Sequence, residues 1–241
     1  MNGDPVAVVL GARNLGGAIL DHLISDGWRG AAVARSEETA AAVRERGALG
    51  IAADASDPSS LDSALASVRT ELGPPGLIVN AVSAARPPGG GPFGGGPIAD
   101  ADVSGFRGWT AAVAEQAFVF LSAGLRALRE SGGGTLVQVT GGSARRAMPG
   151  RGLWSAGAQA ARAMVHAAAQ ETREQGIHVA LVIVDATIES PKTESYTRDQ
   201  PREALADQRL IAEAVSFLAG QEQRAYTHEL MLTPAGDRWV P

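Results

Sequence analysis

Short apolar runs alternate along the chain with longer, alanine-rich amphipathic segments. The runs have the length and β-branched composition of buried strands, and they cover residues 6–11, 30–35, 50–56, 77–83, 134–140 and 178–184. The segments between them repeat apolar residues at helical spacing, at 16–27, 36–47, 60–73, 109–131 and 155–176. A last helix is expected at 205–220 and a last strand at 228–233. The pattern predicts an α/β protein.

The connections between these elements are short, so each strand returns through a helix and must run parallel to its predecessor. We therefore expect a Rossmann-like, doubly wound parallel sheet of about seven strands with helices on both faces. A chain of 241 residues is long enough for one such domain and short for two. A single domain spanning residues 1–241 is predicted.

A glycine- and proline-rich segment, residues 86–100, follows the fourth expected strand. In open parallel sheets, ligands bind beyond the carboxyl ends of the strands, where this segment must lie. Two interpretations stay open: a mobile surface connection, and a lid over a ligand cleft.

Composition excludes several classes of function. The formal charge of −5 and the 20% of charged residues give no basis for binding nucleic acid. The absence of cysteine excludes disulfides and thiolate chemistry, and the four scattered histidines lack metal-ligand spacing, so no metal is expected. No signal-like N-terminus and no run of about 20 apolar residues is evident, so we expect a cytoplasmic protein without membrane contact.

The turn between the first expected strand and helix, residues 11–16, contains glycine. Backbone N–H groups and the helix dipole at such a turn can hold a pyrophosphate. Here the chain resembles the short-chain dehydrogenase/reductase (SDR) family, whose turn has the pattern G-x-x-x-G-x-G. One alignment puts Leu10, Asn14 and Gly16 at the three glycine positions. The other starts at Gly11 and shortens the turn by one residue, so either alignment departs from the pattern.

Other segments fit the resemblance better. Asp54 begins a segment that resembles the one whose Asp meets adenine, and Asn80 begins a stretch similar to the family's N-A-G, with Val82 in place of glycine. Arg35 closes the second expected strand where an acidic residue would accept the ribose hydroxyls of NAD. Together with Arg13 in the turn, it suits the 2′-phosphate of NADP(H).

The resemblance thus implies a set of nucleotide-binding residues: Gly11, Arg13, Asn14, Leu15, Gly16, Arg35, Asp54, Ala55, Asn80, Ala81 and Val82. The departures in the turn and at Val82 imply weak binding of NADP(H). A second alternative, that no cofactor binds, stays open.

The family's catalytic tetrad of Asn, Ser, Tyr and Lys is replaced throughout. Trp154 stands at the Tyr position and Ala158, four residues later, stands at the Lys position. Gly141 occupies the Ser position and Val113 the Asn position. Since a positioned general acid contributes about 10²–10⁴ in rate, ordinary carbonyl reduction is expected to fall to a trace.

Three residues remain as candidates for the pocket: Trp154 as a wall or stacking surface, Ser143 as a replacement hydroxyl, and Gln116 one helical turn after Val113. The only lysine, Lys192, lies far downstream in the sequence and is not expected to take over the lost chemistry.

Three functions follow from this pattern. The first is a non-redox enzyme that uses the family's pocket for a small-molecule substrate. The second is a non-catalytic NADP(H)-binding or partner subunit, and the third is an atypical NADP(H)-dependent oxidoreductase. Because the helix expected at 155–174 has small side chains and the family packs this helix against its copy, a homodimer or homotetramer is also expected.

Overall fold

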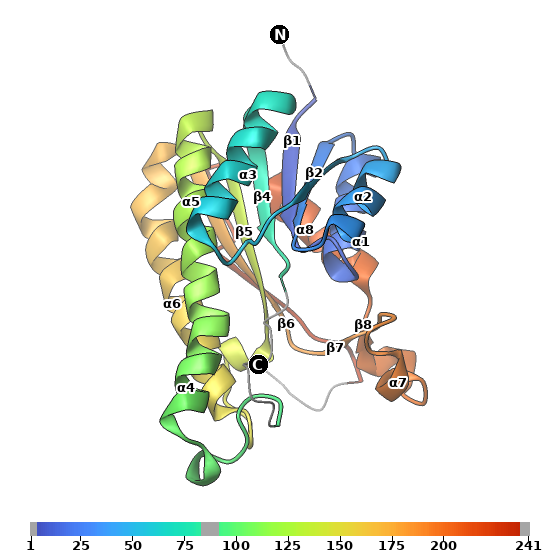
Figure 1. Cartoon of the computed structure of the whole chain (residues 1–241), viewed down its shortest axis with the longest axis vertical. Helices are drawn as coiled ribbons and strands as arrows, with labels where there is room; N and C mark the ends of the chain where they lie inside the picture. The colour runs from blue at the N-terminus through green and yellow to red at the C-terminus, as the bar shows by residue number, and fades with distance from the viewer. Residues whose placement is uncertain (1–3, 83–91, 237–241) are drawn as a thin grey trace.

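The computed structural model describes residues 4–82 and 92–236, which form one parallel sheet with helices on both faces (Figure 1). The sheet has seven strands in the order β3-β2-β1-β4-β5-β6-β9. In chain order the strands are β1 Val6–Leu10, β2 Arg29–Ala34, β3 Leu49–Ala52, β4 Pro75–Asn80, β5 Gly134–Gly141, β6 Ile177–Val184 and β9 Glu229–Leu232. All neighbouring strands pair in parallel, which confirms the predicted doubly wound fold.

Helices cover the two faces of the sheet as separate groups (Figure 1). One face carries α3 Pro58–Glu71, α5 Gln116–Ser131 and α6 Gly152–Thr172, and the other carries α1 Leu15–Ser25, α2 Glu37–Glu45 and α8 Gln208–Ala219. Each group encloses its own apolar core. Phe120, Leu136 and Val165 are fully buried in the first core, and Ile19, Leu77 and Val215 are fully buried in the second.

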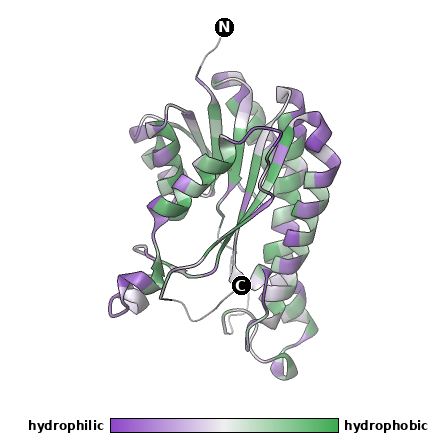
Figure 2. Cartoon of the chain, turned by 180° about the vertical axis from the view of Figure 1, so that it is seen from behind, coloured by the Kyte–Doolittle hydropathy of each residue, from purple (hydrophilic) through white to green (hydrophobic). Residues whose placement is uncertain are grey.

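Hydropathy follows this layering (Figure 2). The strands are hydrophobic along their length, whereas the outer faces of the helices are hydrophilic. β6 is buried at all eight positions, as a central strand covered on both faces must be. Continuous apolar runs in the sequence therefore identified the central strands correctly.

The helix expected at 109–131 begins earlier and is not uniform. It runs as α4 Val103–Thr110, a π-helical segment Ala111–Glu115, and α5. The stretch Val103–Ser131 is the one in the described ranges that is long and apolar enough to span a membrane, which corrects the expectation that no segment reaches this length. Half of its most apolar window is buried, and Phe120 and Leu128 face the first core.

A smaller unit follows β6. The strands β7 Thr187–Ile188 and β8 Leu205–Ala206 pair in parallel, and the short helix α7 Glu194–Thr197 lies between them in sequence. Short 3-10 turns occur at Ile98–Asp100, Gly142–Ala144, Arg173–Gln175 and Arg202–Ala204. The chain after β7 returns to the carboxyl edge of the main sheet, which affects the site described below.

Part of the segment 86–100 lies outside the described residues, namely 86–91. The rest packs on the start of α6: Gly96 forms a β-bridge with Arg151, and the Gly94 carbonyl accepts a hydrogen bond of 3.3 Å from Trp154 N–H. The described portion of this segment is therefore held against the start of α6.

Candidate functional site

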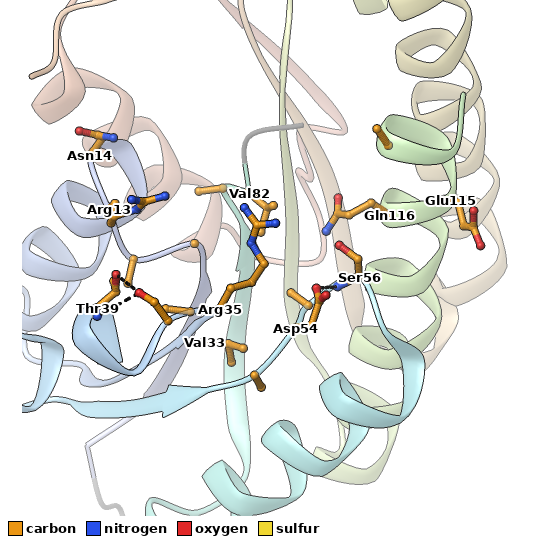
Figure 3. A pocket seen from close by; sticks show the side chains of 18 of the residues that line it. Arg13, Asn14, Val33, Arg35, Thr39, Asp54, Ser56, Val82, Glu115 and Gln116 are labelled. Carbon is orange, nitrogen blue, oxygen red and sulfur yellow. Dashed lines mark hydrogen bonds between the residues drawn. The ribbon is translucent and has the colours of Figure 1, made fainter. Parts of the chain in front are cut away.

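A cleft of about 1240 Å³ opens at the carboxyl edge of the sheet, the edge at which the topology predicts a ligand (Figure 3). The β1–α1 turn and the ends of β2, β3 and β4 form its floor and one side. Gly108 of α4, the π-helical segment and Gln116 form the opposite wall, and Lys192 contributes from the segment after β7.

The β1–α1 turn settles how the glycines align. Leu10 is the last residue of β1 and is fully buried in the core, so it does not enter the turn. Gly11 has a φ of 88°, and Asn14 has a φ of 47°. A Cβ on Gly16 would lie 1.5 Å from the Gly11 carbonyl oxygen, so only glycine fits there. The alignment with Leu10 as the first glycine is wrong, and the shorter turn is correct.

The same turn presents the N-terminus of α1 to the cleft. Asn14 is the N-cap residue, and its side chain makes no capping hydrogen bond. No acidic residue occupies the first turn of this helix. The free N–H groups of this turn and the helix dipole therefore favour an anion such as a diphosphate. Leu15 starts the helix and packs against the second core, so it supports the turn and does not line the cleft.

Two arginines line the cleft beside this turn. Arg13 lies in the turn, Arg35 directly follows β2, and both side chains are exposed. Figure 3 shows the Arg35 guanidinium extending into the open space between the two walls. Neither guanidinium forms a hydrogen bond or ion pair with any residue in the described ranges. Both charges are therefore available to an anionic ligand.

Asp54 and Ala55 follow β3 and line the cleft, as expected. The Asp54 carboxylate accepts a hydrogen bond of 2.9 Å from the Ser56 N–H. The Asp54 backbone N–H in turn donates a hydrogen bond of 3.0 Å to Ser60 Oγ. These contacts hold the turn in one conformation. Figure 3 shows Asp54 beside Ser56 at the edge of the cleft.

Three buried amides support the end of β4. Asn80 Nδ2 donates to Gln116 Oε1 at 3.0 Å and to Gln138 Oε1 at 2.9 Å. Asn80 Oδ1 accepts from the Val82 N–H at 3.2 Å. Asn80 is fully buried and does not line the cleft, whereas Ala81 and Val82 do. Asn80 therefore positions the residues that form the floor.

Gln116 is the one pocket candidate from the sequence that reaches the cleft. It is the first residue of α5, directly after the π-helical segment, and Figure 3 shows its amide on the cavity side while Glu115 points away. A π-helical turn is rare and often occurs at functional sites. Because Asn80 fixes the Gln116 amide, Gln116 offers an oriented hydrogen-bonding group at this wall.

The four tetrad positions lie elsewhere. Val113, Gly141, Trp154 and Ala158 are all described, and none of them is among the residues that line the cleft. Ala158 is buried with 1% of its surface exposed. Val113 packs against α6, since a Cβ on Gly157 would lie 3.0 Å from the Val113 Cβ.

Trp154 packs into an aromatic cluster and is not a cleft wall, which corrects the sequence prediction. Its ring lies 4.4 Å from the Phe93 ring in an edge-to-face arrangement, and Phe93 also contacts Trp109 at 5.6 Å. The far edge of the indole lies 3.7 Å from where a Cβ of Gly141 would be. Phe93, which no sequence pattern singled out, is therefore the main aromatic neighbour of this indole.

Ser143 is buried with 1% of its surface exposed, in the 3-10 turn after β5. Its hydroxyl has no hydrogen-bond partner within the described residues, and the same holds for Ser155 on α6. Ser143 does not line the cleft, so its proposed role as a replacement hydroxyl gains no geometric support.

An ion pair covers the ends of β5 and β6. Asp185, which is 5% exposed, accepts two hydrogen bonds from Arg146, of 3.1 Å from Nε and 3.3 Å from Nη2. A Cβ on Gly142 would lie 1.8 Å from Asp185 Oδ1, so the carboxylate fills the space beside this glycine. Sequence analysis did not single out Asp185 and did not predict this pair.

Lys192 corrects a further expectation. It is distant in sequence from the tetrad positions, yet β7 brings the following segment back to the sheet edge and places Lys192 in the cleft lining. The cleft thus gathers three cationic residues, Arg13, Arg35 and Lys192, and two acidic ones, Asp54 and Glu115. No group of three or more His, Asp or Glu in the described ranges is arranged to hold a metal ion.

A family model for short chain dehydrogenases matches residues 5–201 of the chain. The chain belongs to the short-chain dehydrogenase family. No curated protein matches it.

Solved structures of this family share its fold. An alcohol dehydrogenase from the archaeon Thermococcus sibiricus, complexed with 5-hydroxy-NADP, matches with a TM-score of 0.78 and 24% identity, covering 99% of this chain and 100% of that one. A variant actinorhodin polyketide ketoreductase with NADPH matches with a TM-score of 0.80 and 21% identity, covering 98% of each chain. A short-chain dehydrogenase from Rhodopseudomonas palustris matches with a TM-score of 0.74 and 19% identity, covering 97% and 100%.

The residues of this short-chain dehydrogenase fit the two halves of a nicotinamide dinucleotide unequally. The glycine turn, the free guanidinium groups of Arg13 and Arg35, and Asp54 fit an adenosine diphosphate that carries a ribose phosphate. At the other half, the ion pair between Arg146, which is a third exposed, and the buried Asp185 occupies the ends of β5 and β6. The adenosine half fits and the nicotinamide half does not.

Proposed function

We propose that this chain is an NADP(H)-binding member of its family that has lost the family's carbonyl-reducing chemistry. The observation that carries the proposal is the pair of cleft arginines, Arg13 and Arg35, which have exposed guanidinium groups without partners among the described residues. They lie beside a glycine turn and a helix N-terminus, the two features that bind a diphosphate. NADP-bound structures with the same fold support the choice of nucleotide.

The preference for NADP(H) over NAD(H) follows from charge. The two nucleotides differ by one phosphate on the adenosine ribose, and Arg35 directly follows β2, the strand whose end meets that ribose in this topology. A charge-assisted hydrogen bond to a phosphate contributes about 1.5–3 kcal/mol. Loss of Arg35 is therefore expected to remove most of the discrimination.

Binding is expected to be weak, with a dissociation constant in the range of tens of micromolar or poorer. Ala158 replaces a lysine that would bind the ribose, which forfeits about 1.5–3 kcal/mol, or roughly ten- to a hundredfold in affinity. Leu10 adds no steric cost to this figure, because it is buried in β1 and lies outside the turn.

The non-redox enzyme that sequence analysis placed first is now the less favoured function. Sequence analysis assigned Trp154 to its pocket as a wall or stacking surface, but Trp154 contacts Phe93 and Gly141 and is not among the residues that line the cleft. The atypical oxidoreductase has one observation in its favour: Lys192, an ammonium that lines the cleft, is a proton donor. A non-catalytic nucleotide-binding subunit requires none of the four side chains of the family's catalytic tetrad.

Isothermal titration calorimetry with NADP⁺ and NAD⁺ tests the proposal. We expect NADP⁺ to bind more tightly, and Arg35→Ala to bring the two constants together. Arg69→Ala is the matched control, because this arginine pairs with Glu130 on the outer surface and leaves the cleft unchanged. Absence of binding at millimolar nucleotide, or a preference for NAD⁺, contradicts the proposal.

A panel of aldehydes and ketones with NADPH tests the loss of chemistry. We expect no turnover above about 10⁻³ of a typical rate of 10 s⁻¹. Turnover of whole molecules per second that disappears in Lys192→Ala would support the atypical oxidoreductase instead.

A further inference from the structure

The carboxyl edge of this sheet divides into two halves. In a sheet of this order, the β1–β3 half holds one nucleotide of a dinucleotide and the β4–β6 half holds the other. The cleft lining includes the ends of β1, β2, β3 and β4. Within the described part of the chain it includes no residue from the ends of β5 or β6. The strand ends that border the open space are therefore mainly those of the adenosine half, while α4, the start of α5 and Lys192 border it from the other side.

Packed groups occupy the second half. The carboxylate of Asp185 lies directly against the backbone of Gly142, so the ends of β5 and β6 are in contact through it. Arg146 holds this carboxylate with two hydrogen bonds, and Asp185 is almost fully buried. Displacing the pair for a planar ring would leave the buried carboxylate of Asp185 without its partner, which is unfavourable.

An aromatic group blocks the neighbouring position. The indole of Trp154 lies beside Gly141, at the end of β5, and Phe93 packs against the same indole. Ala158 is buried and carries no charge at the family's lysine position, and the lysine that lines the cleft, Lys192, comes from the segment after β7. Beside Gly141, a nicotinamide ring would therefore meet the indole and find no lysine at the family's position.

We infer that the Arg146–Asp185 pair and Trp154 close the second half of the crevice, so that the chain binds NADP(H) only through its phosphorylated adenosine diphosphate and leaves the nicotinamide in solvent. This inference rests on the proposed function and adds the class of ligand. The group recognised is an adenosine diphosphate with a phosphate on the adenosine ribose, and the group beyond the diphosphate contributes no affinity.

Calorimetry with two ligands tests the inference on the full chain: NADP⁺, and 2′-phosphoadenosine diphosphoribose, which lacks only the nicotinamide. We expect the two dissociation constants to agree within about twofold. The emission of the reduced nicotinamide of NADPH is expected to be the same with and without protein. A tenfold or greater advantage for NADP⁺ overturns the inference and leaves the proposed function intact. Failure of both ligands to bind at millimolar concentration overturns the proposed function as well.

A double variant tests the closing groups themselves. Arg146→Ala with Asp185→Gly removes both charges together, so no buried charge is left without a partner. We expect it to favour NADP⁺ over the truncated ligand by fivefold or more. The control is Arg162→Gln with Glu229→Gln, which removes an ion pair of the same chemistry outside the cleft lining and is expected to keep the ratio near one.

A folded double variant, checked by circular dichroism, whose ratio also stays near one overturns the role of the ion pair. If the double variant does not fold, Trp154→Ala gives the second measurement. It opens the edge beside Gly141 without touching a charge. A ratio that rises above about threefold supports the closure, and an unchanged ratio contradicts it.

Discussion

Asn14 has a strained backbone conformation, and its side chain makes no capping hydrogen bond that would compensate for the strain. Replacing Asn14 by glycine should therefore stabilise the protein. Its φ of 47° and ψ of −120° lie outside the left-handed helical region that asparagine tolerates. The side chain is exposed and makes no capping hydrogen bond. Strain of this kind costs about 1–3 kcal/mol, and the greater entropy of glycine in the unfolded chain offsets about 0.4–1 kcal/mol of the relief.

The net gain expected for Asn14→Gly is therefore about 0.5–2 kcal/mol, which raises the Tm by about 1–8 °C in a chain of this size. Differential scanning calorimetry measures it. Asn14→Ala is the matched control: alanine keeps the strain without the local tolerance of asparagine, so its Tm should fall below that of the wild type. A Tm for Asn14→Gly at or below that of the wild type would falsify the argument from strain.

Three further outcomes are expected. Lys192→Ala should weaken the binding of NADP⁺ and of NAD⁺ equally, by about fivefold in titration calorimetry. The reason is that an exposed ammonium near the diphosphate contributes about 1 kcal/mol to the binding of either ligand. Weaker binding of NADP⁺ alone would contradict a place for Lys192 near the diphosphate. Ala163→Glu should convert a homo-oligomer into a monomer, since Ala163 lies exposed on α6 among small residues. Light scattering measures the change, and a monomeric wild type at tens of micromolar would refute the interface on α6. Burial raises the pKa of Glu229, but hydrogen bonds and charge from Arg162 and His166 outweigh it and hold the pKa below its ordinary 4.5. Its stabilising contribution is thus present above about pH 4.5 and is lost as the pH falls through the lowered pKa, so denaturation of Glu229→Gln should show a smaller acid-induced loss of stability than the wild type.

The sheet could be predicted because its strands are buried on both faces. A central parallel strand must be apolar at successive positions, and β6 is, so the run is visible in the sequence without tertiary information. The nucleotide turn was partly predictable for a related reason. Gly11 and Gly16 mark a close approach of backbone to backbone, but the correct alignment depended on Leu10 being buried, which composition does not reveal.

Contacts between distant segments could not be predicted from local patterns. Lys192 reaches the cleft only because β7 pairs with β8 and returns the chain to the sheet edge. Phe93 covers Trp154 from a glycine-rich segment that carries no periodic signal. The π-helical segment Ala111–Glu115 has ordinary helix-forming residues, so its altered hydrogen bonding depends on its surroundings.

The ion pair in the closed half of the crevice affects the stability of the fold, whereas the exposed arginines of the open half do not. Gly142, Arg146 and Asp185 interlock: the carboxylate needs the space that glycine leaves, and its burial needs the arginine. Removing Arg146 alone leaves the almost fully buried Asp185 carboxylate without its partner, at a cost of no more than about 3–5 kcal/mol, which is a large fraction of the stability of a typical domain. Removing Asp185 alone leaves Arg146, which is a third exposed and can be solvated. A single substitution at Arg146 therefore destabilises the protein before it can open room for a ring. Arg13 and Arg35, in contrast, can each be replaced without leaving a buried group unpaired, because both are exposed. The two halves should consequently respond differently to mutation: the adenosine half through ligand affinity, and the opposite half through the stability of the fold.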